Sequence, residues 1–461
     1  MHSKDTREVD PSMRIAHINV TANLSTGRIA AGLCRYAQNA GHKVLLCYGR
    51  GPAPTGIPSL RIGDTLRGPM DLAAQPLKKL LSSTTAAVMG TASKLGVYLH
   101  GGLSRLTDRS GFYSSQTTRY FLTQLDKFQP ELVHLHNLHG YYLNVPMVID
   151  YLRERDIPVV WTLHDSWPYT GHCAYYHFPI PPCLSAADRP DASVPTACLR
   201  WQKGCSSCPL KKTYPTSWLL DQSSRNYMDK WTLFTSLRRL ALATPSRWLA
   251  GEVKRSFFSQ YPVHHLPNGL DLSQFRPCGD ERLMQRTAIR YGLDQLGDRR
   301  LVLSVAAVWD ERKGLSHLTA LSQQLGSGYC VAVVGLTEKQ QKALPAGMLA
   351  IPHTATVEEL CALYTIADLY ISLSQGETMG MTLLESMACG TQVLCYHTTA
   401  MPELVTPECG ESVPVGDIAA AADAVRRLCD EPKDPFACME QAARYSPENC
   451  YRGYLELYEQ L

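Results

Sequence analysis

The sequence has little excess charge of either sign and no long apolar run. Its 461 residues carry a formal net charge of only +3, with 19% charged residues, so composition gives no electrostatic case for binding nucleic acid. No apolar run reaches the roughly 20 residues that a membrane-spanning helix needs. We therefore expect the chain to recognise small or local partners, with no nucleic acid among them.

The chain also lacks a recognisable export signal. Residues 1–12 are charged, unlike a signal peptide, and we expect them to form a disordered leader. Sixteen cysteines without an export signal favour a reducing cytosol, where most of them serve as small core residues. The predicted location is cytoplasmic, and a peripheral contact would place the protein at the inner face of the membrane.

Length and pattern predict an α/β protein with more than one domain. With 45% apolar residues, 461 residues can bury two cores and are too many for one ordinary domain. Apolar runs that read as strands alternate with helical stretches, which predicts parallel sheets. These runs are Val44–Cys47, Leu132–His136, Val159–Leu163, Leu301–Ala306, Cys330–Val334 and Leu369–Leu373.

The most informative segment places Glu377 and Glu385 eight residues apart. We predict a turn over residues 376–380 and a helix over Met381–Ala388, so Glu377 lies in the loop and Glu385 inside the helix. Ionised carboxylates accept hydrogen bonds from hydroxyls, and the pair would suit the sugar and the ribose of a sugar nucleotide. An amphipathic helix with a solvated glutamate at each end is the alternative.

The start of the same helix suits an anion. The backbone N–H groups of Met379, Gly380 and Met381 would point out of the helix N-terminus, where a diphosphate is well held. A second loop after a strand carries Arg312 and Lys313, either of which could neutralise a diphosphate. A solvated pair of surface cations is the alternative.

Histidines follow two other strand ends, where a doubly wound fold places ligands. His164 ends one run beside Asp165, either as a functional residue or as a structural histidine. A further cluster, of which His136, His139 and Tyr142 are the candidates for the acceptor side, follows another run. Simple packing and hydrogen bonding would explain that cluster equally well.

The Glu-x7-Glu segment resembles the signature of family 4 retaining glycosyltransferases. The family has the GT-B fold, in which two Rossmann-like doubly wound domains face a central cleft. Further segments resemble the family along nearly the full length, and they are Met13–Asn19, Ser25–Ile29, Gly41–Leu46, Thr244–Trp248 and Leu266–Asp271.

The resemblance implies roles for single residues. Glu377 would contact hydroxyls of the donor sugar, and Glu385 the ribose. Lys313 matches the phosphate-binding lysine, and His164 the active-site histidine that faces the donor sugar. Gly27 would sit in the loop that meets the donor phosphate, although a lone glycine also fits an ordinary turn.

One position departs from the family pattern. Members commonly carry an arginine six residues before the lysine, where this chain has Ala307. Arg312 is therefore the candidate for the second positive charge.

A polar, glycine-bearing stretch from Gly269 to Arg299 marks the domain junction, and together with the resemblance it predicts the domain layout. Residues 13–270 would form the N-terminal acceptor domain, with insertions at 60–115 and 171–212. Residues 271–446 would form the C-terminal nucleotide-sugar domain, and the helix at 447–461 would cross back to the first domain.

Four cysteines form a possible metal set inside the second insertion. Cys173, Cys198, Cys205 and Cys208 include a Cys-x2-Cys end and could hold a structural zinc ion tetrahedrally. Cys183, His172 and His177 are competing ligands, and unligated cysteines in a packed loop are the alternative. The pattern resembles a subgroup close to the colanic-acid and capsular polysaccharide enzymes.

The predicted function is retaining transfer of a hexose from a nucleotide diphosphate sugar to a sugar acceptor in surface or capsular polysaccharide assembly. No Asp-x-Asp pair is present, so we expect no cofactor in catalysis, with Arg312, Lys313 and helix-end N–H groups stabilising the diphosphate. Basic and apolar residues between Arg61 and Arg109 could rest on an anionic bilayer and meet a lipid-linked oligosaccharide, or cap the domain in solvent. The alternatives are a nucleotide-sugar epimerase, a hydrolase and a non-catalytic binding scaffold.

Overall fold

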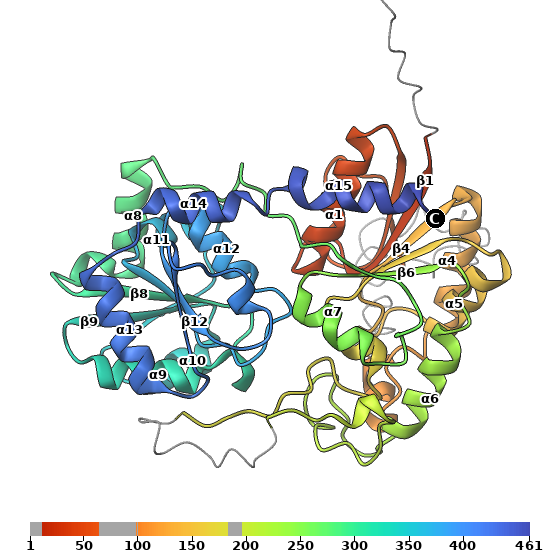
Figure 1. The fold of residues 1–461 in the computed structure, drawn as a ribbon, viewed down its shortest axis with the longest axis horizontal. Helices are drawn as coiled ribbons and strands as arrows, with labels where there is room; N and C mark the ends of the chain where they lie inside the picture. The colour runs from red at the N-terminus through yellow and green to blue at the C-terminus, as the bar shows by residue number, and fades with distance from the viewer. Residues whose placement is uncertain (1–11, 64–97, 99, 183–195) are drawn as a thin grey trace, which may run out of the picture.

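The computed structural model describes residues 12–63, 98, 100–182 and 196–461, which form two α/β units lying side by side (Figure 1). The described strands of the first unit make a seven-stranded parallel sheet in the order β3-β2-β1-β4-β5-β6-β7. Those of the second make a six-stranded parallel sheet in the order β10-β9-β8-β11-β12-β13. The ends of parallel strands collect at one edge of each sheet, and the predicted site residues follow those ends.

The strands of the first sheet are β1 (Arg14–Thr21), β2 (Lys43–Arg50), β3 (Ser59–Arg61), β4 (Leu132–Leu135), β5 (Val159–Thr162), β6 (Leu240–Thr244) and β7 (Val263–His265). Those of the second are β8 (Arg300–Val305), β9 (Tyr329–Val334), β10 (Leu349–Ile351), β11 (Leu369–Ser372), β12 (Val393–Tyr396) and β13 (Gly410–Val413). Each strand predicted from the apolar runs is present, because both faces of a parallel sheet are covered and its strands are apolar throughout.

The α-helices of the first unit include α1 (Thr26–Asn39), α4 (Ser115–Phe128), α5 (Val145–Glu154), α6 (Ser223–Phe234) and α7 (Arg247–Lys254), and residues 100–107 are also helical. Those that follow are α8 (Glu281–Tyr291), α9 (Leu315–Leu325), α10 (Glu338–Ala343), α11 (Val357–Ile366), α12 (Met381–Ala388), α13 (Ile418–Asp430), α14 (Pro435–Ala443) and α15 (Pro447–Glu459). The helix predicted over Met381–Ala388 begins and ends where the sequence placed it. No helix of the described residues is both long enough and apolar enough to span a bilayer.

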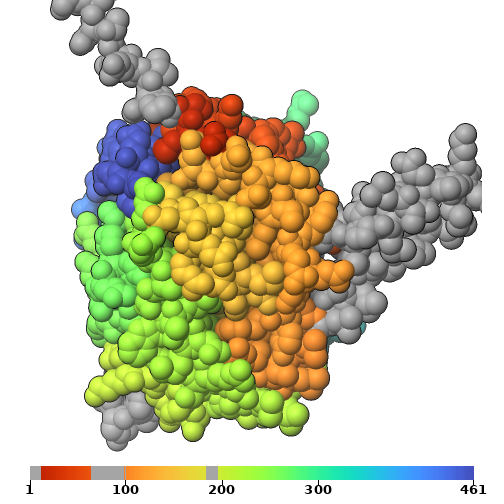
Figure 2. All heavy atoms as spheres, turned by 90° about the vertical axis from the view of Figure 1, so that its right-hand side faces the viewer, coloured from red at the N-terminus to blue at the C-terminus, as the bar shows by residue number. Residues whose placement is uncertain are grey.

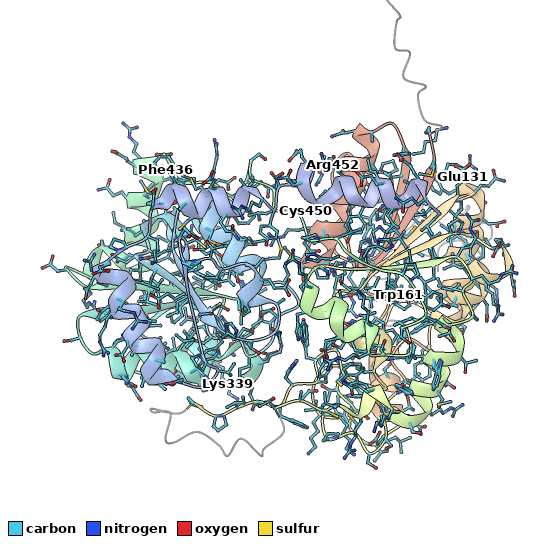
Figure 3. The ribbon with its side chains drawn as sticks, viewed as in Figure 1. Glu131, Trp161, Lys339, Phe436, Cys450 and Arg452 are labelled. Atoms are coloured by element: carbon cyan, nitrogen blue, oxygen red, sulfur yellow. The ribbon has the colours of Figure 1, made fainter. Side chains whose placement is uncertain are left out.

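The last helix, α15, lies on the first unit although α14 belongs to the second, as the positions of Cys450 and Arg452 show (Figures 1 and 3). Its buried Tyr451 and Tyr454 share an apolar cluster with α1. A Cβ at Gly32 of α1 would lie 2.9 Å from the Tyr451 hydroxyl, so glycine allows the two helices to approach closely. This packing ties the chain end to the first sheet.

Three regions predicted from the sequence fall partly outside the described residues. All of the predicted leader except Ser12 lies outside them. So do residues 64–97 and 99 of the predicted insertion at 60–115, and residues 183–195 of the insertion at 171–212.

Candidate active site

Glu377 lies in the loop between β11 and α12. The two cations of the loop after β8, Arg312 and Lys313, meet its carboxylate there. Lys313 Nζ lies 2.5 Å and Arg312 Nη1 3.5 Å from Glu377 Oε1, and the Ser374 hydroxyl donates to the same oxygen at 2.7 Å. Burial by itself raises the pKa of Glu377, but Lys313 and Arg312 outweigh it and lower the pKa to about 2. The carboxylate is therefore ionised throughout the physiological range.

A glycine places Lys313 at this loop. Gly314 has φ +76°, and a Cβ there would lie 2.2 Å from the Leu373 carbonyl oxygen at the end of β11. No other residue type allows this approach without moving the backbone. Gly314 thus lets the loop pack against the end of β11, so that the Lys313 amine reaches the segment that carries Glu377.

Arg312 is fixed more firmly than Lys313. Its Nη1 donates to the Gly376 carbonyl at 2.6 Å, and its guanidinium lies 4.0 Å from the centre of the Tyr175 ring. Tyr175 belongs to the first unit, so this cation–π contact spans the two units. Arg312 therefore orients the loop as well as adding charge.

The N-terminus of α12 has the form of an anion site. Gly380 precedes the helix with φ +102°, and no side chain caps its first turn. Met379 is buried, with its sulfur 3.3 Å from the Asn268 amide, while the side chain of Met381 is half-buried. The predicted phosphate-binding N–H groups therefore lie next to the loop that holds Glu377.

Glu385 lies within α12, where its Oε2 is 3.1 Å from the Tyr364 hydroxyl. Burial raises the pKa of Glu385 to about 7, although the charge of Arg28 and the bond to Tyr364 act in the opposite direction. Arg28 stands in the first turn of α1. The carboxyl group is therefore close to half-ionised at neutral pH.

Gly27 occupies the start of α1, directly before Arg28. A Cβ at Gly27 would lie 2.8 Å from the backbone of Thr21 and Ala22. The glycine therefore lets the helix start close to the end of β1, which explains the residue type independently of any ligand.

His164 follows β5 and meets the second unit. Its carbonyl oxygen accepts a hydrogen bond of 2.9 Å from Thr378, the residue after Glu377. Its ring Nε2 lies 3.0 Å from His136 Nδ1. Burial lowers the pKa of His164 to about 4 against the opposing charge of Asp165, so the imidazole is neutral at pH 7.

The three residues predicted for the acceptor side are buried and have internal partners. His136 lies between His164 and His17, 3.2 Å from His17 Nδ1. His139 Nε2 lies 2.7 Å from Asp165, and the Tyr142 hydroxyl donates to the Asn137 carbonyl at 2.9 Å. Of the three, His136 contacts His164 directly, and contact of any of them with an acceptor stays a prediction.

Several contributors to the site had no signal in the sequence. Tyr364 binds Glu385 from a different helix, and Tyr175 stacks on Arg312 from the cysteine-bearing segment. Thr399 accepts the backbone N–H of Glu377 at 2.9 Å. None stands at a motif spacing from its partner, so only the fold brings them together.

Two sequence-family models match the chain. One described as Glycosyltransferase Family 4 matches residues 26–274, more than half of the chain, and one described as Glycosyl transferases group 1 matches residues 285–445. WcaC of Escherichia coli (strain K12), which is named as a colanic acid biosynthesis glycosyl transferase, is 21% identical over 355 residues, covering 72% of this chain and 77% of its own. A GDP-mannose-dependent alpha-(1-6)-phosphatidylinositol monomannoside mannosyltransferase of Mycolicibacterium smegmatis is 29% identical over 234 residues, covering 46% of this chain and 59% of its own.

Solved structures share the fold over nearly the whole chain. Sucrose-phosphate synthase of Thermosynechococcus elongatus superposes with a TM-score of 0.63 at 17% identity, covering 97% of this chain and 98% of its own. HepE of Anabaena, solved in complex with UDP-glucose, superposes with a TM-score of 0.60 at 12% identity, covering 97% of this chain and 100% of its own. Such low identities show the fold alone, which is GT-B, as predicted.

Proposed function

The chain belongs to glycosyltransferase family 4, and from that premise we propose that it moves a hexose from a nucleoside diphosphate sugar to a sugar acceptor with retention of configuration. The observation that carries the proposal is the cluster of Glu377, Lys313 and Arg312 beside the first turn of α12. The chain is a glycosyltransferase, and the comparisons give no support to an epimerase, a hydrolase or a scaffold. HepE was solved with UDP-glucose, which supports a sugar nucleotide as donor.

Each group has a defined task in the proposed reaction. Lys313 has three N–H bonds, so it can hold Glu377 and a diphosphate oxygen together. The first turn of α12 binds the other phosphate oxygens, Glu377 accepts sugar hydroxyls, and Glu385 accepts ribose hydroxyls. Because Lys313 and the first turn of α12 are already in place, they stabilise the leaving diphosphate without reorganisation.

Retention follows from attack on the face that the diphosphate leaves. The acceptor hydroxyl bonds to the anomeric carbon while the bond from that carbon to the phosphate oxygen breaks, and the departing oxygen takes the hydroxyl proton. Asp165 is engaged by His139 and by the Trp167 amide at 2.9 Å, so it is not poised as a nucleophile. The sequence also lacks an Asp-x-Asp pair, which supports a reaction without a catalytic divalent metal.

Donor binding should weaken as pH falls, because the ribose hydroxyls bond best to ionised Glu385. With a pKa of about 7, the carboxyl group is roughly nine-tenths ionised at pH 8 and roughly one-tenth at pH 6. We expect one member of a panel of nucleoside diphosphate hexoses to bind, with a dissociation constant that rises up to about tenfold from pH 8 to pH 6. Calorimetric titration measures both.

The variant Glu385→Gln is the control for this experiment. It should bind the same donor with a weaker affinity that no longer changes over this pH range. Failure of every donor in the panel to bind the wild-type protein would overturn the proposed function.

For the acceptor, we infer a lipid-linked sugar used in polysaccharide assembly. WcaC is named for colanic acid biosynthesis, and another relative is an O-antigen chain mannosyltransferase of Escherichia coli. A lipid-linked acceptor requires the enzyme to work at a bilayer surface. The first unit has an exposed surface that suits such a contact.

This surface joins residues 217–220 to the helical residues 103–107, which lie in neighbouring regions of the face in Figure 2. The Trp218 amide donates to the Arg105 carbonyl at 2.6 Å, and the Arg105 guanidinium lies 5.6 Å from the Trp218 ring centre. Trp218 and Leu219 are 63% and 65% exposed. Apolar side chains beside a cation suit the interface of an anionic bilayer.

Sedimentation with vesicles tests this contact. We expect the protein to bind vesicles of phosphatidylglycerol and phosphatidylcholine, and the double variant Trp218→Ser with Leu219→Ser to bind at least about fivefold more weakly. Phe436→Ser is the matched control, since Phe436 is 75% exposed on α14 of the second unit (Figure 3). Equal vesicle binding by the wild-type protein and both variants would overturn the membrane contact, and so would no binding by any of them.

A further inference from the structure

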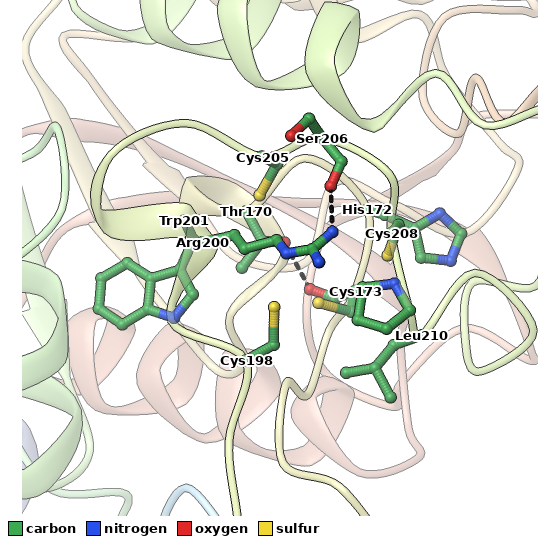
Figure 4. Close-up of a pocket in the computed structure, with 11 residues that line it drawn as sticks. Thr170, His172, Cys173, Cys198, Arg200, Trp201, Cys205, Ser206, Cys208 and Leu210 are labelled. Atoms are coloured by element: carbon green, nitrogen blue, oxygen red, sulfur yellow. Dashed lines mark hydrogen bonds between the residues drawn. The ribbon is translucent and has the colours of Figure 1, made fainter. Parts of the chain in front are cut away.

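Four cysteines from separate positions along the chain surround one small cavity in the first unit. Cys173, Cys198, Cys205 and Cys208 all line it, and their side chains project towards the same space (Figure 4). The cavity volume is about 10 Å³, close to one water-sized sphere. The space therefore suits a single ion and no larger ligand.

Backbone amides point at two of the sulfurs. The Gly171 N–H donates to Cys205 Sγ at 3.1 Å, and the Leu210 N–H donates to Cys208. A Cβ at Gly171 would lie 2.1 Å from the Ser223 carbonyl oxygen, so glycine permits this approach. Cysteine sulfurs that bind a metal commonly accept backbone hydrogen bonds of this kind.

The turn between the last two cysteines is held in shape. Arg200 Nη1 donates to the Ser206 carbonyl at 2.6 Å (Figure 4). The same nitrogen also donates to the Ser207 carbonyl. Ser207 has φ +46°, the left-handed conformation that a tight Cys-x2-Cys turn uses. These contacts set the two sulfurs on the same side of the turn.

A buried lysine lies next to the cluster. Lys230 is 1% exposed, and its amine donates to the Trp167 and Thr170 carbonyls at 2.7 and 2.9 Å. Within the described part of the chain, no carboxylate lies at ion-pair distance from it. Burial lowers the pKa of Lys230 to about 7, and four thiolates around a divalent ion would carry a net negative charge that favours its charged form.

We propose that Cys173, Cys198, Cys205 and Cys208 bind one zinc ion with tetrahedral geometry. The site is closed, since all four ligands come from the protein, and its role is structural. No three of the four sulfurs all lie within 4.8 Å of one another, whereas Zn–S bonds of ~2.3 Å in a tetrahedron place sulfurs ~3.8 Å apart. Binding therefore requires the loops that carry them to move closer together.

Other potential ligands are His172, which lines the same cavity, and a cluster of three histidines elsewhere in the first unit. His172 Nδ1 pairs with Asp108, while its Nε2 is buried without a partner, so His172 is the rival fourth ligand. His17, His134 and His136 do place ligand atoms within 4.8 Å of one another. Both ring nitrogens of His134 already bond to Tyr458 and Thr162, so that trio carries no metal proposal.

The zinc site would anchor a segment that reaches the second unit. Directly after Cys173, the chain runs through Tyr175 under Arg312 to Ile180, whose amide donates to Gln375 Oε1 at 2.6 Å. The returning chain pairs with this segment, as the Cys198 amide donates to the Tyr176 carbonyl at 2.8 Å. Zinc would fix both arms of the segment at their base. Any effect of zinc on activity through this segment rests on the proposed donor site.

Metal content is the direct test. We expect elemental analysis of the full-length protein, produced with zinc in the medium, to give about one zinc per chain, and Cys198→Ser and Cys208→Ser to lower this at least about fivefold. Cys278→Ser is the matched control, a half-buried cysteine of the second unit that should retain the zinc. Loss of zinc in His172→Gln with retention in Cys198→Ser would overturn this ligand set.

A second measurement needs no variant. Titrating the native wild-type protein with a mercurial should release one zinc for every four thiols modified in the cluster. A coloured zinc indicator detects the released zinc. Zinc removal should then expose new protease cleavage sites within residues 171–212 first. Protein that contains no zinc and whose thiols react without releasing any would overturn the proposal, whatever the outcome of the donor panel.

Discussion

Glu377→Gln lowers the turnover number by about 100-fold, because the neutral amide no longer provides a charge-assisted acceptor for the donor sugar and leaves Lys313 and Arg312 without their counter-charge. Losing such a bond costs roughly 1.5–3 kcal/mol, which corresponds to roughly 10- to 150-fold in rate. Loss of preorganised charge at the reacting centre favours the upper part of that range. Steady-state rates at saturating donor measure the effect.

The melting temperature should fall moderately in this variant, because the Glu377 side chain is only 16% exposed and the folded protein stabilises its charge through Lys313 and Arg312. A melting curve checks that the loss of rate is not a loss of fold. Glu411→Gln is the matched control, because Glu411 pairs with Arg427 at 2.8 Å in the same unit, away from the site. Wild-type turnover in Glu377→Gln would contradict the assignment.

Lys313→Ala should reduce kcat/KM by about 100-fold and Arg312→Ala by about tenfold. Lys313 has N–H bonds left for a diphosphate after bonding Glu377, whereas Arg312 is held by the Gly376 carbonyl and the Tyr175 ring. Arg312→Ala should therefore lower the melting temperature more than Lys313→Ala does. Kinetics and melting curves on the two variants separate the roles.

The same assays test the reaction without a divalent metal. Rates should be unchanged when magnesium and manganese are left out, because the cations and the first turn of α12 carry the diphosphate charge. Strict dependence on either ion would contradict that mechanism. An Arg312 effect larger than that of Lys313 would mean that the guanidinium, not the amine, holds the phosphates.

Local sequence determined the elements around the site. The run before Glu377 is apolar on both faces and could only be a buried strand, and the helix over Met381–Ala388 follows from its spacing of apolar residues after Gly380. Lys313 and Gly27 were singled out by resemblance to the family, and the structure adds that Gly314 and Gly27 each permit a close backbone approach. Each of these signals depends on neighbours within about ten residues along the chain.

Tertiary structure decided how those elements act on each other. Lys313 contacts Glu377, which lies 64 residues away along the chain, and Thr378 bonds to the carbonyl of His164, which lies 214 residues away. Glu385 has a pKa of about 7 while Glu377, eight residues earlier, has one of about 2, although both are glutamates of the same motif. Residue type and spacing cannot give that difference, because a pKa depends on burial and on charges that the fold brings near, and those come from distant parts of the chain.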